Sequence, residues 1–204
     1  MKQKTLNMLT RVQQWWQAYW LFRWTVANVI GWNSGLILAG ILIWLIGFPG
    51  ILLSGAVITA GLSIAQAWCL FTKEEMPLRY KWSIYSSLAG GIAIFPAGVF
   101  VLLGFFNLWL ALILAALIFS GILSLVQAFV LVAMLDDKAY LWIPVNMLAG
   151  IVTAIITVPI LQSPIPLLFS PASVVFGLIT GKLLMRWMNT TEELLRAETE
   201  NPQN

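Results

Sequence analysis

Six polar side chains stand out because each lies within an otherwise apolar stretch of the chain. They carry amide, hydroxyl and amine groups, and they are Asn28, Gln66, Ser86, Gln127, Asn146 and Lys182. A buried amide or hydroxyl without a hydrogen-bond partner costs free energy, so we expect these groups to point inward and to meet in one polar layer. Such a layer either fastens neighbouring helices through amide pairs or lines a polar pocket for a small ligand or a lipid head group. Amide pairing is common between apolar helices and favours the first interpretation.

Lys182 is the one charged residue that the pattern places inside an apolar stretch. It lies four residues before Arg186, near the end of that stretch, so its long side chain can extend to a polar boundary. The alternative is that Lys182 joins the polar layer and offers a cation to an anionic ligand. We favour the first interpretation because no acidic residue shares its depth.

Catalytic chemistry is not expected from this chain. The sequence contains no histidine, and histidine is the commonest general base and metal ligand. Its single cysteine, Cys69, excludes an internal disulfide and has no histidine to activate it as a nucleophile. We therefore predict a non-enzymatic protein without a metal or another cofactor.

The composition requires that lipid cover most of the surface. Apolar residues make up 60% of the chain and charged residues only 9%, whereas a soluble domain has about a quarter of its residues charged. The charges gather before the first apolar run, after the second, after the fourth and at the end of the sixth. The net charge of +3 is spread over these loops and does not indicate a nucleic-acid partner. Six spans are predicted, at about 24–48, 50–71, 81–103, 108–134, 140–161 and 171–187.

The position of the charges predicts the orientation of these spans. Loops rich in Lys and Arg stay in the cytoplasm, so both termini are expected on that side of a bacterial inner or thylakoid-type membrane. Residues 1–22 alternate apolar and polar side chains at helical spacing and predict an amphipathic helix at the cytoplasmic interface, with a poorly ordered basic tail as the alternative. Residues 23–188 form the predicted six-helix transmembrane domain, and residues 189–204 a short acidic cytoplasmic tail.

The predicted hairpins resemble one another in sequence. Each incoming helix has a tryptophan, a polar residue four positions later and a glycine three or four beyond that: Trp24, Asn28 and Gly31; Trp82, Ser86 and Gly90; Trp142, Asn146 and Gly150. The outgoing helices place Gln66, Gln127 and Lys182 five or six residues after a glycine. Every repeat starts on the same side, so the copies are parallel. The expected fold is an all-α integral membrane protein in which three tandem hairpins form a pseudo-threefold bundle of six transmembrane helices.

These tandem tryptophan-asparagine-glycine and glycine-glutamine helices resemble those of a loosely defined group of uncharacterised bacterial membrane proteins, common in cyanobacteria. The resemblance covers most of residues 23–187. It implies a multi-pass membrane protein and carries no established activity.

Two further patterns concern packing. Most of the eleven tryptophans fall at the depth of an aromatic belt, whereas Trp32 lies within the first span, where it could line a pocket. Glycines four residues apart, such as Gly31 with Gly35 and Gly177 with Gly181, predict close contact between helices, or less often a dimer interface.

Three functions are compatible with these observations. The leading hypothesis is an accessory or scaffold subunit that packs beside other membrane proteins or a second copy of itself. The first alternative is a small-molecule-binding subunit of a transporter. The second alternative is a lipid- or pigment-binding membrane protein. Membrane lipids are expected partners under all three.

Overall fold

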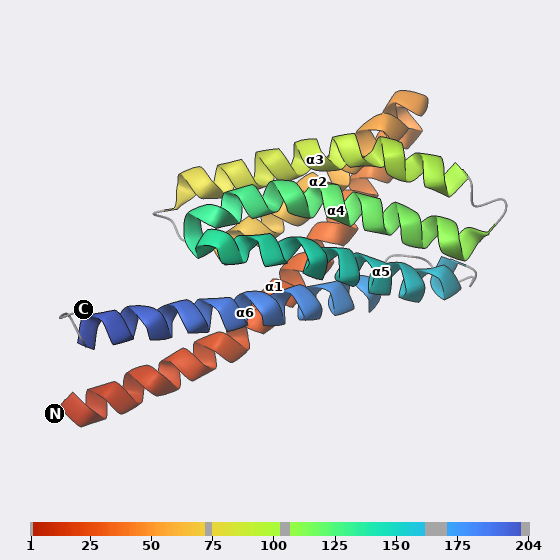
Figure 1. Ribbon diagram of the computed structural model, residues 1–204. Coiled ribbons are helices and arrows are strands. Elements are labelled where there is room, and N and C mark those ends of the chain that lie inside the picture. Colours follow the sequence, from red (N-terminus) through yellow and green to blue (C-terminus); the bar gives the residue numbers. More distant parts are fainter. Residues whose placement is uncertain (1, 72–74, 103–106, 162–170, 201–204) are drawn as a thin grey trace.

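The computed structural model describes residues 2–71, 75–102, 107–161 and 171–200, and this part of the chain is built from helices joined by short turns (Figure 1). A six-residue 3₁₀ segment, η2, joins α4 to α5. The helices are α1 (Lys2–Ile46), α2 (Phe48–Leu70), α3 (Met76–Leu102), α4 (Leu108–Leu135), η2 (Asp136–Leu141), α5 (Trp142–Leu161) and α6 (Pro171–Glu200).

Local sequence explains where several of these helices begin and end. Gly47 separates α1 from α2 with a positive φ of 62°, a conformation that glycine adopts without steric cost. Proline occupies the first turn of α2, where its missing N–H is not needed. The side chain of Asn107 accepts a hydrogen bond of 3.0 Å from the backbone N–H of Leu110 and so caps α4. Helix α6 begins at Pro171, as the sequence predicts.

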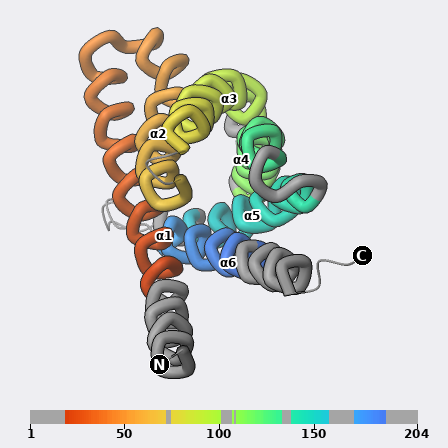
Figure 2. The backbone as a smooth tube through the Cα atoms, turned by 90° about the vertical axis from the view of Figure 1, so that its left-hand side faces the viewer, coloured from red at the N-terminus to blue at the C-terminus, as the bar shows by residue number. Residues whose placement is uncertain are grey.

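The six α-helices form a closed ring. Each helix packs on the next in chain order, and α6 closes the ring by packing on α1. Figure 2 shows this ring nearly end on, with the joined ends of α1 and α2 standing away from it. The side chains at that tip are largely exposed, and Trp44 is 84% exposed.

Five helices contain a segment that is long and apolar enough to cross a membrane by length and composition. These segments are Tyr19–Ile46, Phe48–Leu70, Met76–Phe100, Trp109–Val132 and Lys138–Thr157. The chain is therefore a multi-pass, membrane-embedded helical protein. Helix α6, the sixth predicted span, is not among the five within the described residues.

The bundle has two unlike ends. One end holds the α2–α3 connection, η2, the start of the apolar part of α1 and the last part of α6. We call it the charged end, because Arg23, Arg79, Lys138 and Arg186 lie there. The opposite end, with the Gly47 turn and the α3–α4 connection, is the uncharged end.

The predicted domain boundaries do not coincide with breaks in the helices. Helix α1 runs without interruption through residues 22 and 23, so the segment predicted as a separate interfacial helix continues directly into the first span. Helix α6 likewise continues past residue 189 to Glu200. The apolar loop predicted between the fifth and sixth spans and residues 201–204 lie outside the described residues.

The main core lies at the charged end and is built around tryptophan. Its members are Trp20, Trp24, Ala67, Phe71, Trp82, Val130, Leu131, Ala139, Trp142, Leu184 and Trp187. The interpretation of most tryptophans as an aromatic belt is therefore wrong for five of them. These rings pack in one cluster with small residues such as Ala67 and Ala139, and small residues let helices approach closely.

Glycines bring the helices together. A side chain at Gly31 would collide with the backbone of Gly61 and Leu62 in α2, and one at Gly181 would collide with Leu21 and Trp24 in α1. The predicted close contacts thus occur within one chain.

The same contacts differ between the hairpins that the sequence analysis aligned. Gly90 and Gly150 pack on the outgoing helix of the preceding hairpin, against Thr59 and Ser120, whereas Gly31 packs on its own hairpin. Counting eight residues from each tryptophan places Trp32, and not Gly31, at the position of Gly90 and Gly150. A large ring therefore stands where the other two hairpins have a glycine.

Candidate functional site

Five of the six predicted polar residues are buried at one level of the bundle. Asn28, Gln66, Ser86, Gln127 and Asn146 are each at most 2% exposed. Within the first hairpin, Gln66 Nε2 donates to Asn28 Oδ1 at 2.9 Å, and within the second, Gln127 Nε2 donates to Ser86 Oγ at 3.1 Å. These bonds join incoming and outgoing helices of a hairpin, which is the fastening role expected of paired amides.

Tryptophan indoles link one hairpin to the next at the same level. Trp142 Nε1 donates to Gln127 Oε1 at 2.9 Å, which joins α5 to α4. Trp24 Nε1 donates to Thr180 Oγ1 at 3.0 Å, which joins α1 to α6 and so closes the ring. Thr180 is 0% exposed, and its own hydroxyl donates to the backbone oxygen of Phe176.

Lys182 takes no part in this layer. It lies on the exposed face of α6, and Thr180 occupies the place that the sequence pattern had suggested for it. The spacing of small polar residues on the outgoing helices places Thr180, and not Lys182, at the position of Gln66 and Gln127. On each outgoing helix a hydroxyl residue is followed four positions later by a small residue, and three positions after that by a residue that bonds within the layer. The sets are Thr59, Ser63 and Gln66; Ser120, Ser124 and Gln127; Ser173, Gly177 and Thr180.

Three fully buried tryptophans close the bundle next to this layer. The rings of Trp24 and Trp142 lie 6.4 Å apart in an edge-to-face arrangement, and those of Trp82 and Trp142 lie 6.2 Å apart. All three are 0% exposed. We call them the tryptophan triad. Because each ring comes from a different hairpin, the triad is also the point where the three hairpins meet.

Two buried polar atoms of the layer have no hydrogen-bond partner among the described residues. They are Gln66 Oε1 and Trp82 Nε1. Trp142, at the start of the third hairpin, donates to Gln127 of the second hairpin. Trp82, at the start of the second hairpin, stands in the same relation to Gln66 of the first, but these two atoms do not bond to each other. The junction between the first and second hairpins thus lacks an indole bond, although the Ser63 hydroxyl of α2 donates to the backbone oxygen of Ser83 in α3 at 3.3 Å.

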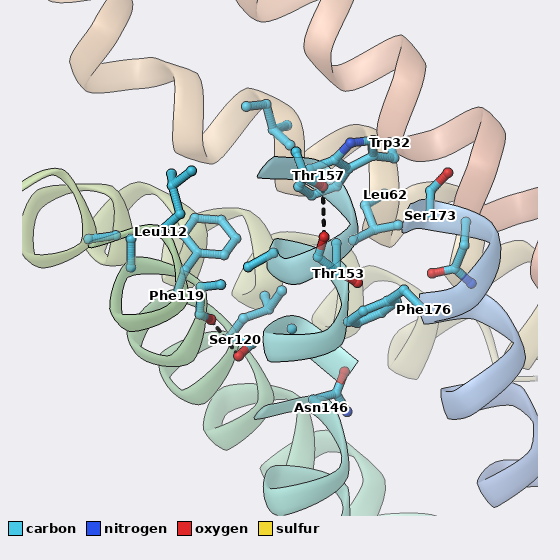
Figure 3. A pocket seen from close by; sticks show the side chains of 18 of the residues that line it. Trp32, Leu62, Leu112, Phe119, Ser120, Asn146, Thr153, Thr157, Ser173 and Phe176 are labelled. Carbon is cyan, nitrogen blue, oxygen red and sulfur yellow. Dashed lines mark hydrogen bonds between the residues drawn. The ribbon is translucent and has the colours of Figure 1, made fainter. Parts of the chain in front are cut away.

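A cavity of about 300 Å³ adjoins the layer on the side of the uncharged end (Figure 3). Side chains from all six helices line it, and most are apolar, including Ile58, Leu112, Phe119 and Phe176. On every helix the lining residues lie between the tryptophan triad and the uncharged end. The triad therefore lies between the cavity and the charged end. Trp32, which stands where the other two hairpins have a glycine, is part of the cavity wall.

Comparison of the chain with protein-family models, with curated proteins and with solved structures gives no match. The resemblance to bacterial membrane proteins seen in the repeats stays a prediction, and the site must be interpreted from its own geometry.

Two asparagines lie where the cavity meets the layer, and their amides differ in pairing. The Nδ2 of each donates to a backbone oxygen one turn earlier: Asn28 to Trp24 and Asn146 to Trp142, both at 2.8 Å. Asn28 Oδ1 also accepts a bond from Gln66. Among the described residues nothing donates to Asn146 Oδ1. The difference follows from sequence, because the third hairpin has the short Thr180 where the first has the long amide of Gln66.

The sequence reasoning missed Thr180 and the hydroxyl residues of the cavity wall, such as Thr153. The repeated four-and-three spacing of Thr, Ser and Gln was the signal that would have found Thr180. No comparable signal marks the cavity, because its wall is built mainly of Ala, Leu, Ile and Phe, which occur throughout the chain.

Proposed function

We propose that this protein is a non-catalytic membrane protein that holds an apolar, lipid-like small molecule at the centre of its helical bundle. The observation that carries this proposal is the cavity lined by side chains from all six helices. Its volume of about 300 Å³ is roughly twice that of an apolar cavity known to hold benzene, and it falls at the lower end of the range for ligand pockets. A wall of this composition suits a hydrocarbon body.

The proposed architecture is a pseudo-threefold bundle of six spans, with α6 as the sixth. Two like bonds, from Trp24 to Thr180 and from Trp142 to Gln127, support it, as does the repeated four-and-three spacing of the outgoing helices. In this arrangement Lys182 and Arg186, both exposed near the charged end, extend their charges to the head-group region.

The proposed orientation places the charged end, with both termini, in the cytoplasm of a bacterial inner or thylakoid-type membrane. The tryptophan triad would then seal the cytoplasmic side of the cavity. A ligand would reach it from the opposite leaflet or from the side.

The accessory-subunit hypothesis rests on glycine-rich helices, short loops and the lack of reactive groups, and the structure bears on the glycines. Those glycines pack against helices of the same chain, as at Gly31, Gly90, Gly150 and Gly181, so they are not free to hold a partner. Binding in the cavity combines the two alternatives considered from the sequence, a small-molecule-binding subunit and a lipid-binding protein.

The experiment fills the cavity with a larger side chain and measures how much bound ligand is lost. Ala97 is 5% exposed and lines the cavity, whereas Val99 on the same helix is 56% exposed and faces outward. Wild-type protein and the variants Ala97→Leu and Val99→Leu are purified gently, extracted with organic solvent and examined by mass spectrometry.

We expect a hydrocarbon-rich compound in stoichiometric amount from wild-type protein and from Val99→Leu, and much less of it from Ala97→Leu. The same extract from all three proteins, with bulk lipid only, would overturn the proposal.

A further inference from the structure

We infer that the polar end of the bound molecule is a hydrogen-bond donor, such as a hydroxyl group, and that Asn146 Oδ1 accepts its hydrogen bond. This inference rests on the proposed function, because it names the class of ligand that the central cavity takes: a hydrocarbon chain or ring system that ends in an alcohol. Figure 3 shows Asn146 at one end of the cavity with its amide oxygen turned toward the other lining side chains.

The orientation of the Asn146 amide follows from its neighbours. Its Nδ2 lies 2.8 Å from the backbone oxygen of Trp142. Only the nitrogen of the amide can donate to that oxygen, and the flipped amide would place two acceptors against each other. The oxygen must therefore point the other way, into the cavity.

Asn146 is buried as a residue, and its amide oxygen still has bonding capacity. Asn146 is 2% exposed, and no side chain among the described residues donates to its oxygen. An unmade hydrogen bond in an apolar setting costs free energy, so the empty position favours a molecule that brings a donor. A molecule without a hydrogen-bond donor does not remove this free-energy cost.

The unpaired amide oxygen of Asn146 has no counterpart in the first hairpin. In the first hairpin the equivalent oxygen, on Asn28, is already bonded to Gln66. In the third hairpin the equivalent of Gln66 is Thr180, whose hydroxyl is engaged with Trp24 and Phe176. The bundle thus leaves one of its two cavity-lining amide oxygens for a ligand.

Thr153 places a second polar atom on the same face of α5, two turns beyond Asn146. Its Oγ1 is buried without a partner among the described residues, and Thr153 also lines the cavity. The Asn146 oxygen remains the group that selects for a donor, since a hydroxyl can both donate and accept.

The test compares two probes, one of which has a methyl group in place of the hydroxyl hydrogen of the other. These are 1-decanol and decyl methyl ether, which share the alkyl chain and the oxygen. Each displaces tritiated 1-decanol from the full-length protein in lipid nanodiscs. Concentrations are expressed per lipid, and empty nanodiscs supply the background.

We expect 1-decanol to bind about tenfold more tightly than the ether in wild-type protein, which is the effect of about one buried hydrogen bond. Asn146→Leu should remove the preference, so that the two probes bind equally. The matched control is Thr157→Val. Thr157 lines the same cavity, but its hydroxyl already donates to the backbone oxygen of Thr153 at 2.7 Å, so the preference should persist.

The outcomes are distinguishable. Saturable displacement with equal affinity for both probes in wild-type protein would overturn the inference and leave the proposed function standing, with a water molecule as the partner of Asn146. A preference that survives in Asn146→Leu would also overturn it. The absence of any saturable displacement in wild-type protein would count against the proposed function itself.

Discussion

The two halves of this bundle use the same six helices and pack them in opposite ways. At the charged end three tryptophans, each 0% exposed, fill the centre and are held by buried amides and hydroxyls. Toward the uncharged end the centre is a cavity of about 300 Å³. At one level α1, α3 and α5 each direct a large indole to the axis, whereas the side chains further along, from Ala97 and Gly150 to Trp32, leave space between them. One half serves to hold the helices together, and the other is free to hold something else.

The largest effect should come from emptying the packed half. Trp142→Ala removes a fully buried ring that contacts both other members of the triad and donates to Gln127. We expect a loss of about 3–5 kcal/mol in the free energy of unfolding, measured by denaturant titration in bicelles. Trp44, 84% exposed near the Gly47 turn, is the matched control, and Trp44→Ala should change stability by about 0.5 kcal/mol or less. Similar losses in both variants would contradict a tryptophan-centred core.

A second comparison adds the same group to each half. Ala67 is 0% exposed in the core at the charged end, whereas Ala97 lines the cavity. Ala67→Leu should cost about 1–3 kcal/mol through overpacking. Ala97→Leu should cost much less, because its added atoms enter empty space. The same unfolding titration measures both. Equal costs would mean that the cavity does not persist in the membrane.

The smallest effect should separate the two glutamines. Gln127 makes two side-chain hydrogen bonds, to Ser86 and from Trp142, whereas Gln66 makes one, to Asn28. At about 0.6 kcal/mol for each bond between membrane helices, Gln127→Leu should cost about twice as much as Gln66→Leu. Gln66→Leu also removes an oxygen that has no partner among the described residues. An equal loss for the two variants would contradict this difference and indicate that Trp82 bonds to Gln66 in the membrane.

Much of the helical framework was predictable from residues close together in sequence. The approximate bounds of the helices follow from apolar length and from turn residues such as Pro171, because these act over a few positions. The first turn was predicted between residues 48 and 50, whereas it lies at Gly47. The burial of Asn28, Gln66 and Gln127 was also expected, since amides cannot face lipid. The register of the repeat was predicted wrongly at Gly31 and Lys182. Spacing along a chain does not say which neighbouring helix a residue faces.

The sequence by itself determined that this is a helical membrane protein with its charges at one end and a set of amides within its helices. Only the tertiary structure decided that tryptophans from three hairpins meet in the centre, that Thr180 completes the layer, and that a cavity remains beside Asn146. The physical reason is the distance along the chain over which each interaction acts. Helix formation and membrane insertion depend on short stretches, whereas the pairing of Trp24 with Thr180, 156 residues apart, depends on how six helices close into a ring.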